Sequence, residues 1–236
     1  ELTPYLKEGE NKLAAQVFKW TSSSWCEDQD FFRFSGIYRD VYLYAIPEVH
    51  VSDVKIQTLL DDTFTKADLV IDTKATKAGK VKITLSKDGE ELQSVEETLA
   101  EESQYVMKVE NPELWSAESP VLYDLLLEVM DENGQVTEVI PQRVGFRRFE
   151  MKDSIMMLNG KRIVFKGVNR HEFSSVSGRV VSREELIKDL VTMKQNNINA
   201  IRTCHYPDAV GIYELCDEYG IYMIAECNME SHGSWD

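Results

Sequence analysis

Between positions 159 and 236, stretches with the pattern of a β-strand alternate at short intervals with stretches with the pattern of an α-helix. Apolar runs at residues 163–168, 200–203 and 221–225 have the length of buried strands. Strands that alternate with helices form a parallel sheet, and such sheets place reactive residues at the carboxyl ends of the strands. This feature predicts both an α/β domain and the edge at which its chemistry lies.

Two helices are expected between these strands. The first begins at Ser182, because Ser182 and Glu185 have the spacing of a capping box and apolar residues then recur along one helix face. The second runs from about residue 208 to residue 219, where Gly220 is suited to end it. Three strands are too few to close a (β/α)₈ barrel, which usually needs about 250 residues. We therefore expect the chain to stop partway through this domain.

The first part of the chain, residues 1–46, is expected to be the end of a β-sandwich. Leu13, Ala15 and Val17 recur at the period of a strand, and the chain opens in what reads as the middle of a strand-rich domain. A loop follows with Asp28, Gln29 and Asp30. From the residues alone, Asp30 is either a solvated loop acid or a group that binds a ligand.

Residues 47–148 are expected to form a separate immunoglobulin-like sandwich. Strand patterns recur at close spacing, and Asp88-Gly89 and Asn133-Gly134 have the sequence of hairpin turns. A third such turn, Asn159-Gly160, leads into the parallel sheet of residues 149–236. Trp115 reads as a plug between the two sheets of the sandwich, with a platform for a sugar ring as the alternative. The predicted fold class is therefore multidomain, with β-sandwiches followed by an α/β domain.

Composition excludes several classes of function. The net charge of −15 would repel a phosphate backbone, so no nucleic-acid partner is expected. No apolar run approaches the roughly 18 residues that a membrane-spanning helix needs, so no membrane association is expected. Four scattered cysteines read as buried reduced thiols, which predicts a reducing compartment and hence the cytoplasm. They are Cys26, Cys204, Cys216 and Cys227.

Polar residues directly follow the first two strands of the predicted sheet. Asn169, Arg170, His171 and Glu172 follow the first strand and are expected to face solvent or a ligand. His205 follows the second strand, where Pro207 keeps the intervening residue extended. Each histidine could instead satisfy backbone groups. Glu226, at the third strand, is expected to pair with Arg202.

Glu230 and His232 lie two residues apart after the third strand, on a segment expected to be extended. Side chains at this spacing share one face, so the carboxylate and the imidazole could hold one ion together. Two protein ligands completed by water are most typical of Mg²⁺. A chance Glu-x-His pair is the alternative. Carboxylates and histidines without a nucleophile elbow or phosphate loop indicate a polar uncharged ligand, and sugars have that character.

At these residues the sequence resembles glycoside hydrolase family 2. The resemblance covers nearly the whole chain, with several motifs in one order. They are Ser35-Gly36-Ile37-Tyr38-Arg39-Asp40-Val41, Asn111-Pro112-Glu113-Leu114-Trp115-Ser116, Val144-Gly145-Phe146-Arg147, residues 167–172, residues 199–207 and residues 226–233. It implies the end of a jelly-roll sugar-binding domain in residues 1–46, an immunoglobulin-like domain in residues 47–148 and the start of a TIM barrel in residues 149–236.

Within the family, the residues most resemble those of the β-galactosidases, which hydrolyse terminal β-D-galactosides such as lactose with retention of configuration. Glu230 and His232 match their magnesium ligands, a pair that family β-glucuronidases lack. Asp30 matches an aspartate that reaches the galactose 6-hydroxyl and a sodium ion. His171 and His205 match residues that contact sugar hydroxyls, and Asn169 is assigned to the same substrate site. The sequence departs from the pattern at Phe173-Ser174-Ser175, where galactosidases often carry more histidines.

The resemblance also implies that the acid/base and nucleophile glutamates lie on later barrel strands than those present here. We therefore expect this polypeptide alone to be inactive and to bind galactosides and Mg²⁺ weakly, and the full-length enzyme to be a homo-oligomer. Two alternatives stay open: another family 2 glycosidase, such as a β-glucuronidase or β-mannosidase, or a non-catalytic carbohydrate-binding scaffold.

Overall fold

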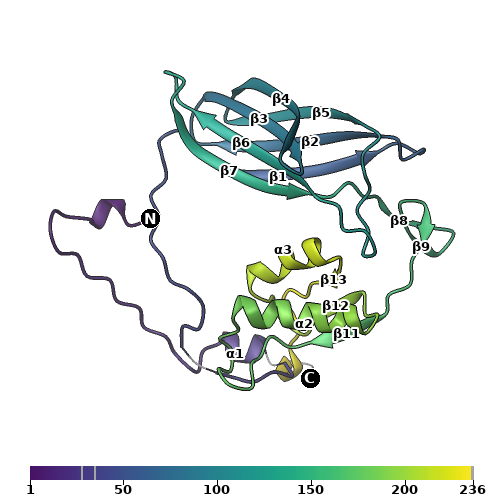
Figure 1. Ribbon diagram of the computed structural model, residues 1–236. Helices are drawn as coiled ribbons and strands as arrows, with labels where there is room; N and C mark the ends of the chain where they lie inside the picture. Colours follow the sequence, from purple (N-terminus) through teal and green to yellow (C-terminus); the bar gives the residue numbers. More distant parts are fainter. Residues whose placement is uncertain (28, 35, 235–236) are drawn as a thin grey trace.

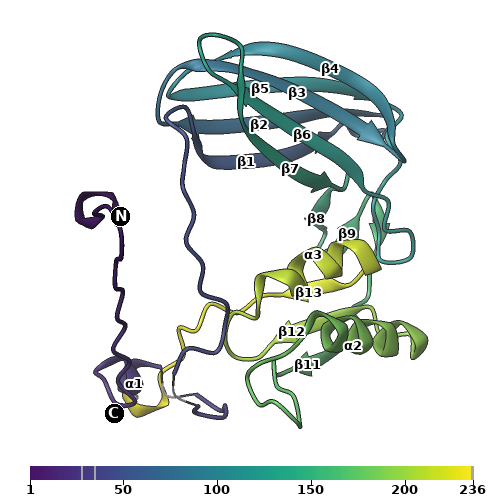
Figure 2. The same cartoon turned by 60° about the vertical axis from the view of Figure 1, so that its left-hand side comes forward.

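The computed structural model describes residues 1–27, 29–34 and 36–234. Figure 1 shows a β-sandwich lying over a small parallel sheet with two helices, and an extended segment at the beginning of the chain that runs beside both. In the turned view of Figure 2 the beginning of that segment stands away from the sandwich, and its helix α1 (Ser23–Cys26) lies beside the C-terminal end of the chain.

The sandwich consists of two antiparallel sheets, as the strand spacing predicts. One sheet has the order β1-β2-β5 and the other β4-β3-β6-β7. Alternation of apolar and polar residues gives each sheet one buried face, and these faces form a continuous core that includes Leu69, Ile83 and Leu127. The strands are β1 (Val51–Leu60), β2 (Lys66–Ala75), β3 (Gly79–Lys87), β4 (Glu90–Leu99), β5 (Glu102–Glu110), β6 (Tyr123–Met130) and β7 (Val136–Val144).

The hairpin turns predicted from Asx-Gly pairs are confirmed. Asp88 and Gly89, between β3 and β4, both have positive φ angles, of 52° and 83°. A two-residue type I′ hairpin turn requires positive φ at both central residues. The Asn159-Gly160 turn, with φ angles of 50° and 71°, joins β9 (Ile155–Leu158) to β10 (Lys161–Arg162). These two strands and β8 (Phe149–Lys152) form a small sheet that leads from the sandwich to the parallel sheet.

The parallel sheet contains β11 (Gly167–Arg170), β12 (Ala200–Thr203) and β13 (Tyr222–Ile224), in sequence order. The first strand is shorter than predicted and begins at Gly167, because residues 163–166 have no strand partner in the described chain. It is also less buried than predicted: its first three residues are exposed.

Both predicted helices are present and pack on one face of this sheet. In α2 (Arg183–Gln195), the Ser182 side chain accepts a bond from the Glu185 backbone, and the Glu185 side chain accepts one from the Ser182 backbone, so the capping box is confirmed. The second helix, α3 (Val210–Tyr219), ends at Gly220, whose φ of 72° is left-handed as the sequence predicts. Apolar residues of α2, α3 and β12 form a shared core.

The first segment differs from the prediction of strands. Before β1, the described residues contain only the 3₁₀ turn η1 (Thr3–Tyr5) and α1, and the rest is extended chain. Leu13 and Val17 are exposed. A strand needs a neighbour to satisfy its backbone groups, and no partner strand lies beside this segment in the described chain.

The prediction for the cysteines is partly wrong. All four are free, as expected, but only Cys204 and Cys216 are buried, whereas Cys26 and Cys227 are exposed.

Trp115 plugs an interface, though not the one predicted. Its side chain is 1% exposed and lies in a cluster with Ala200 and Tyr222 of the parallel sheet, so it joins the sandwich to the α/β part instead of filling the gap between the two sandwich sheets. Its indole Nε1 donates to the Asp217 carbonyl at 2.8 Å, and its own carbonyl accepts from the Asn159 side chain at 3.1 Å. This burial also excludes the alternative of a platform for sugar.

We expect Trp115→Ala to destabilise the chain by about 3–5 kcal/mol, because it empties a buried volume and orphans a carbonyl. The midpoint of urea unfolding should fall accordingly. The same truncation at the exposed Trp20, whose side chain is 69% accessible, should change the free energy of unfolding by less than about 0.5 kcal/mol. Equal midpoints for the two variants would contradict the interface role.

Candidate functional site

The carboxyl ends of the three parallel strands bring the predicted site residues to one edge. The register pairs Asn169 with Arg202, and Arg202 with Ile224, so the three strands end at nearly the same level. Asn169 and His171 lie two residues apart, so they point to the face of the sheet opposite the helices, while Arg170 between them points toward the helices. The prediction that these residues gather at the carboxyl ends of the parallel strands is therefore confirmed.

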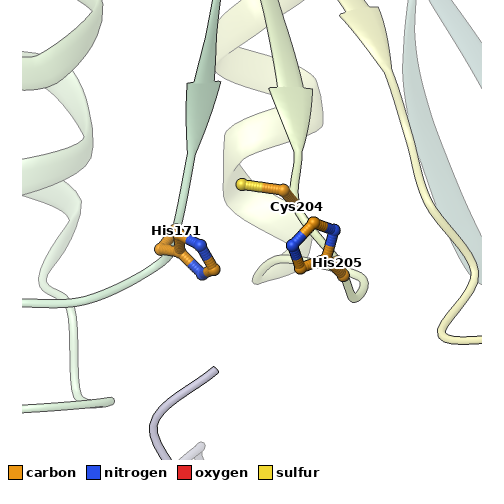
Figure 3. A group of neighbouring side chains, drawn as sticks. All are labelled: His171, Cys204 and His205. Atoms are coloured by element: carbon orange, nitrogen blue, oxygen red, sulfur yellow. The ribbon is translucent and has the colours of Figure 1, made fainter. Parts of the chain in front are cut away.

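His171 and His205 lie side by side at this edge. Their ring centroids are 5.6 Å apart with the rings nearly perpendicular (Figure 3). The His171 Nδ1 lies 3.3 Å from the Tyr206 hydroxyl. Partial burial, followed by the neighbouring His205 and Arg179, lowers the pKa of His171 below its ordinary value. A neutral imidazole is therefore the main form at neutral pH, and it can both donate and accept a hydrogen bond.

His205 forms a triad of contacts with the ion pair of Arg202 and Glu226. The guanidinium Nε of Arg202 donates to Glu226 Oε1 at 2.5 Å, and the His205 Nδ1 lies 3.3 Å from Glu226 Oε2 and 3.1 Å from an Arg202 nitrogen. The prediction that Glu226 pairs with Arg202 is thus confirmed. Because one ring nitrogen is occupied by these groups, the imidazole plane is fixed.

Glu230 and His232 also meet, although they do not lie on a strand. His232 begins the 3₁₀ turn η2 (His232–Ser234), and its Nε2 lies 2.5 Å from Glu230 Oε1. The other carboxylate oxygen of Glu230 lies 3.8 Å from the His205 Nδ1, which links this pair to the histidine pair. A carboxylate and an imidazole that are half-exposed and already in contact are a donor set that a divalent ion can use.

The loop of the first segment closes one side of this edge. Gln29 is buried and its side-chain nitrogen lies 3.5 Å from the Glu230 carbonyl, while the Phe31 and Tyr206 rings meet edge to face at 5.5 Å. Asp30 is exposed, and its negative charge opposes the lowering of the His171 pKa. Asp28 lies outside the described residues.

Arg170 and Glu172 do not face solvent or ligand, as the sequence analysis expected. Both are buried in ion pairs, Arg170 with Asp208 at 2.7 Å and Asp189 at 3.0 Å, and Glu172 with Arg39 at 2.9 Å. Because each neighbour of His171 is anchored in this way, the backbone that carries the imidazole is fixed on both sides. The sequence signal was a pair of opposite charges around a strand-end histidine, but the partners lie too far away in the chain to be found from spacing.

A cavity of about 780 Å³ lies elsewhere, between the sandwich and the amino-terminal end of the sheet. It is lined by Trp115, Arg147 and Tyr222 among others, and by none of the site residues named above. The candidate site is therefore an open edge that is separate from this cavity.

Comparison with known proteins identifies the family. Models of glycosyl hydrolases family 2 match residues 1–47 (sugar binding domain), residues 49–147 and residues 149–236 (TIM barrel domain). The whole chain is 50% identical to a β-galactosidase of Halalkalibacterium halodurans, 51% identical to one of Clostridium acetobutylicum and 44% identical to a β-galactosidase large subunit of Lactobacillus acidophilus. The chain belongs to glycosyl hydrolase family 2, and its fold class is that of the family: sugar-binding, immunoglobulin-like and partial TIM-barrel parts.

Solved structures of similar fold carry other names. A β-glucuronidase of Bacteroides uniformis superposes with a TM-score of 0.79 at 30% identity, over 86% of this chain and 26% of that one. A β-glucuronidase of Parabacteroides merdae gives 0.77 at 28% identity, over 86% and 27%. The chain also spans only 24%, 27% and 38% of the three β-galactosidases named above. Within the described residues, no helix has the length and apolarity to cross a membrane.

Asp208 should make stability depend on pH. Burial raises its pKa from 3.8 to about 6 in spite of Arg170 beside it. The folded chain then holds this proton more tightly than the unfolded chain, so the contribution of this carboxyl to the free energy of unfolding is full below pH about 4 and is lost as the pH rises to about 6.

We expect the free energy of unfolding of wild type, measured with urea, to exceed that of Asp208→Asn by more at pH 4.5 than at pH 7. The two differences should themselves differ by about 2 kcal/mol. Both proteins share all other titrating groups, so the difference isolates this one. A difference that grows with pH would contradict the raised pKa.

Proposed function

We propose that this chain forms the galactose- and magnesium-binding part of a retaining β-galactosidase that hydrolyses terminal β-D-galactosides. The observation that carries the proposal is the meeting of His171, His205, Glu230 and His232 at one strand edge. The identity of 44–51% to β-galactosidases over the whole chain supports the same specificity.

In this proposal, His171, His205 and Asn169 bind hydroxyl groups of the sugar. The neutral imidazole of His171 suits this task, because it offers one donor and one acceptor and no net charge to a neutral pyranose. The triad with Arg202 and Glu226 holds the His205 ring in one orientation. Asp30, on the loop beside His171, is assigned to the sugar 6-hydroxyl and to Na⁺.

Glu230 and His232 would hold Mg²⁺. The ion supplies positive charge that stabilises carboxylates and sugar oxygens around it. The link from Glu230 to His205 supports a role of the ion in positioning the sugar-binding edge, since both residues belong to one contact chain. The acid/base and nucleophile carboxylates of a retaining mechanism are assigned to later barrel strands.

A β-glucuronidase is the second candidate, supported by the similarity to solved β-glucuronidases. The Glu230–His232 pair favours the galactosidase, because it fits a cation and lies at the same edge as the histidines. A homo-oligomeric state and a cytoplasmic location stay predictions.

The specificity is tested with the complete polypeptide and nitrophenyl glycosides. We expect turnover of the β-D-galactoside and at least about 100-fold lower kcat/KM for the β-D-glucuronide and the β-D-mannoside. His205→Ala should lower kcat/KM for the galactoside by about 10–100-fold, because a substrate hydroxyl loses its partner. The matched control is His50→Ala, since His50 pairs with Glu138 in the sandwich. Preference for the glucuronide would overturn the proposal.

Removal of the metal ligands should abolish activation by Mg²⁺. After treatment with a chelator, wild type should regain activity as Mg²⁺ is added, whereas Glu230→Gln and His232→Ala should show little response. Glu218→Gln, an exposed acid on α3, is the control and should respond as wild type does. A full magnesium response in both ligand variants would remove the metal from the proposal.

A further inference from the structure

A thiol lies between the two histidines of the sugar-binding edge. One potential ligand atom each from His171, Cys204 and His205 falls within 4.8 Å of the other two. Figure 3 shows His171 at the end of one strand and Cys204 with His205 at the end of its neighbour, with the sulfur directed toward the strand that carries His171. Neither the family resemblance nor the proposed sugar contacts give this thiol a role.

The donor set has the character of a site for a soft or borderline metal. Two imidazoles and a thiolate are ligands that Zn²⁺ prefers, whereas Mg²⁺ prefers sites with oxygen ligands such as the Glu230 carboxylate and has no affinity for a thiolate. Tetrahedral bonds of about 2.0–2.3 Å place neighbouring ligand atoms about 3.5 Å apart, so these three atoms would need to approach by roughly 1 Å. His171 is exposed, which leaves a path for the ion and an open fourth position for water.

The surroundings of His205 also fit a metal ligand. A histidine bound to zinc usually has its second ring nitrogen bonded to a carboxylate, which fixes the ring and strengthens the ligand. The His205 Nδ1 lies 3.3 Å from Glu226 Oε2 and 3.1 Å from an Arg202 nitrogen, and Glu226 is itself held by Arg202. In the tautomer whose Nδ1–H donates to Glu226, the Nε2 of the ring is the nitrogen available to an ion. His171 has its Nδ1 at 3.3 Å from the Tyr206 hydroxyl, which leaves its Nε2 in the same position.

We propose that His171, Cys204 and His205 form a binding site for Zn²⁺ or a similar thiophilic ion, and that the bound ion excludes the sugar. When the metal–sulfur bond forms, the Cys204 thiol releases its proton to solvent, and no oxidant or reductant takes part. The metal site stands on geometry alone, and only the exclusion of sugar rests on the proposed function. This site is distinct from the pair of Glu230 and His232, which combines a carboxylate oxygen with one imidazole and has no thiolate.

Cobalt reports directly on the thiolate. Co²⁺ added to the complete polypeptide in place of Zn²⁺ should give a sulfur-to-cobalt charge-transfer band, and Zn²⁺ should remove it by displacement. The band should be absent in Cys204→Ser, and unchanged in Glu230→Gln and in Cys26→Ser, whose thiol is exposed and distant from the histidines in sequence. A band that persists in Cys204→Ser overturns the site.

Affinity for Zn²⁺, measured by titration calorimetry in the presence of excess Mg²⁺, gives the second readout. Loss of one of three ligands should weaken binding by about 100-fold or more. Cys204 is buried, so the exposed His171 supplies a variant that leaves the core untouched, and His171→Ala should weaken Zn²⁺ binding while retaining the urea midpoint of wild type. Unchanged affinity in folded His171→Ala overturns the proposal.

Competition with a non-hydrolysable β-thiogalactoside separates the two hypotheses. Zn²⁺ should raise the apparent Kd of the thiogalactoside in wild type and leave it unchanged in Cys204→Ser. If Zn²⁺ binds through Cys204 but the thiogalactoside does not bind, the metal site stands and the galactose site fails. If the thiogalactoside binds and Zn²⁺ does not compete with it, the exclusion of sugar fails.

Discussion

The buried ion pairs on either side of His171 are the constraint on which the site depends. Arg170 points into the helices and bonds Asp189 and Asp208, while Glu172 bonds Arg39 and the Ala209 backbone. A buried charge without its partner is costly, so the loop after β11 has few alternative conformations. The side chains of Arg170 and Glu172 are held in buried ion pairs, so His171 between them is the residue that faces the open edge. The same contacts tie the first segment, through Arg39, to the α/β part of the chain.

Much of the fold could be predicted from the sequence, because its signals are local. The capping box at Ser182, the left-handed Gly220 and the Asx-Gly hairpins each depend on residues a few positions apart, and all are found in the structure. The absence of strands from the described part of residues 1–46 could not be predicted in this way. Their pattern is a strand pattern, but a strand exists only where a neighbour completes its hydrogen bonds, and periodicity does not report on neighbours.

The contrast between local signals and distant contacts also separates the residues of the site that could be predicted from those that could not. The strand-end position of His171, His205 and Glu226 follows from the alternation of strands and helices, which is why these residues could be named in advance. The partners that fix them could not. Glu172 is paired with Arg39, 133 positions earlier in the chain, and Gln29 reaches Glu230 across 201 positions, and no rule of spacing connects such residues. The position of the Cys204 thiol beside His171 also depends on the register of two strands and not on sequence distance.

Trp115 contacts the parallel sheet near Ala200 and Tyr222, at the amino-terminal end of strands whose other end carries the histidines. The sandwich therefore supports the sheet from behind, at the end remote from the reactive groups. The two ends of these strands therefore have separate tasks, cohesion with the sandwich at one end and the presentation of the histidines at the other. A side chain can be exchanged at one end without contact to the residues at the other end.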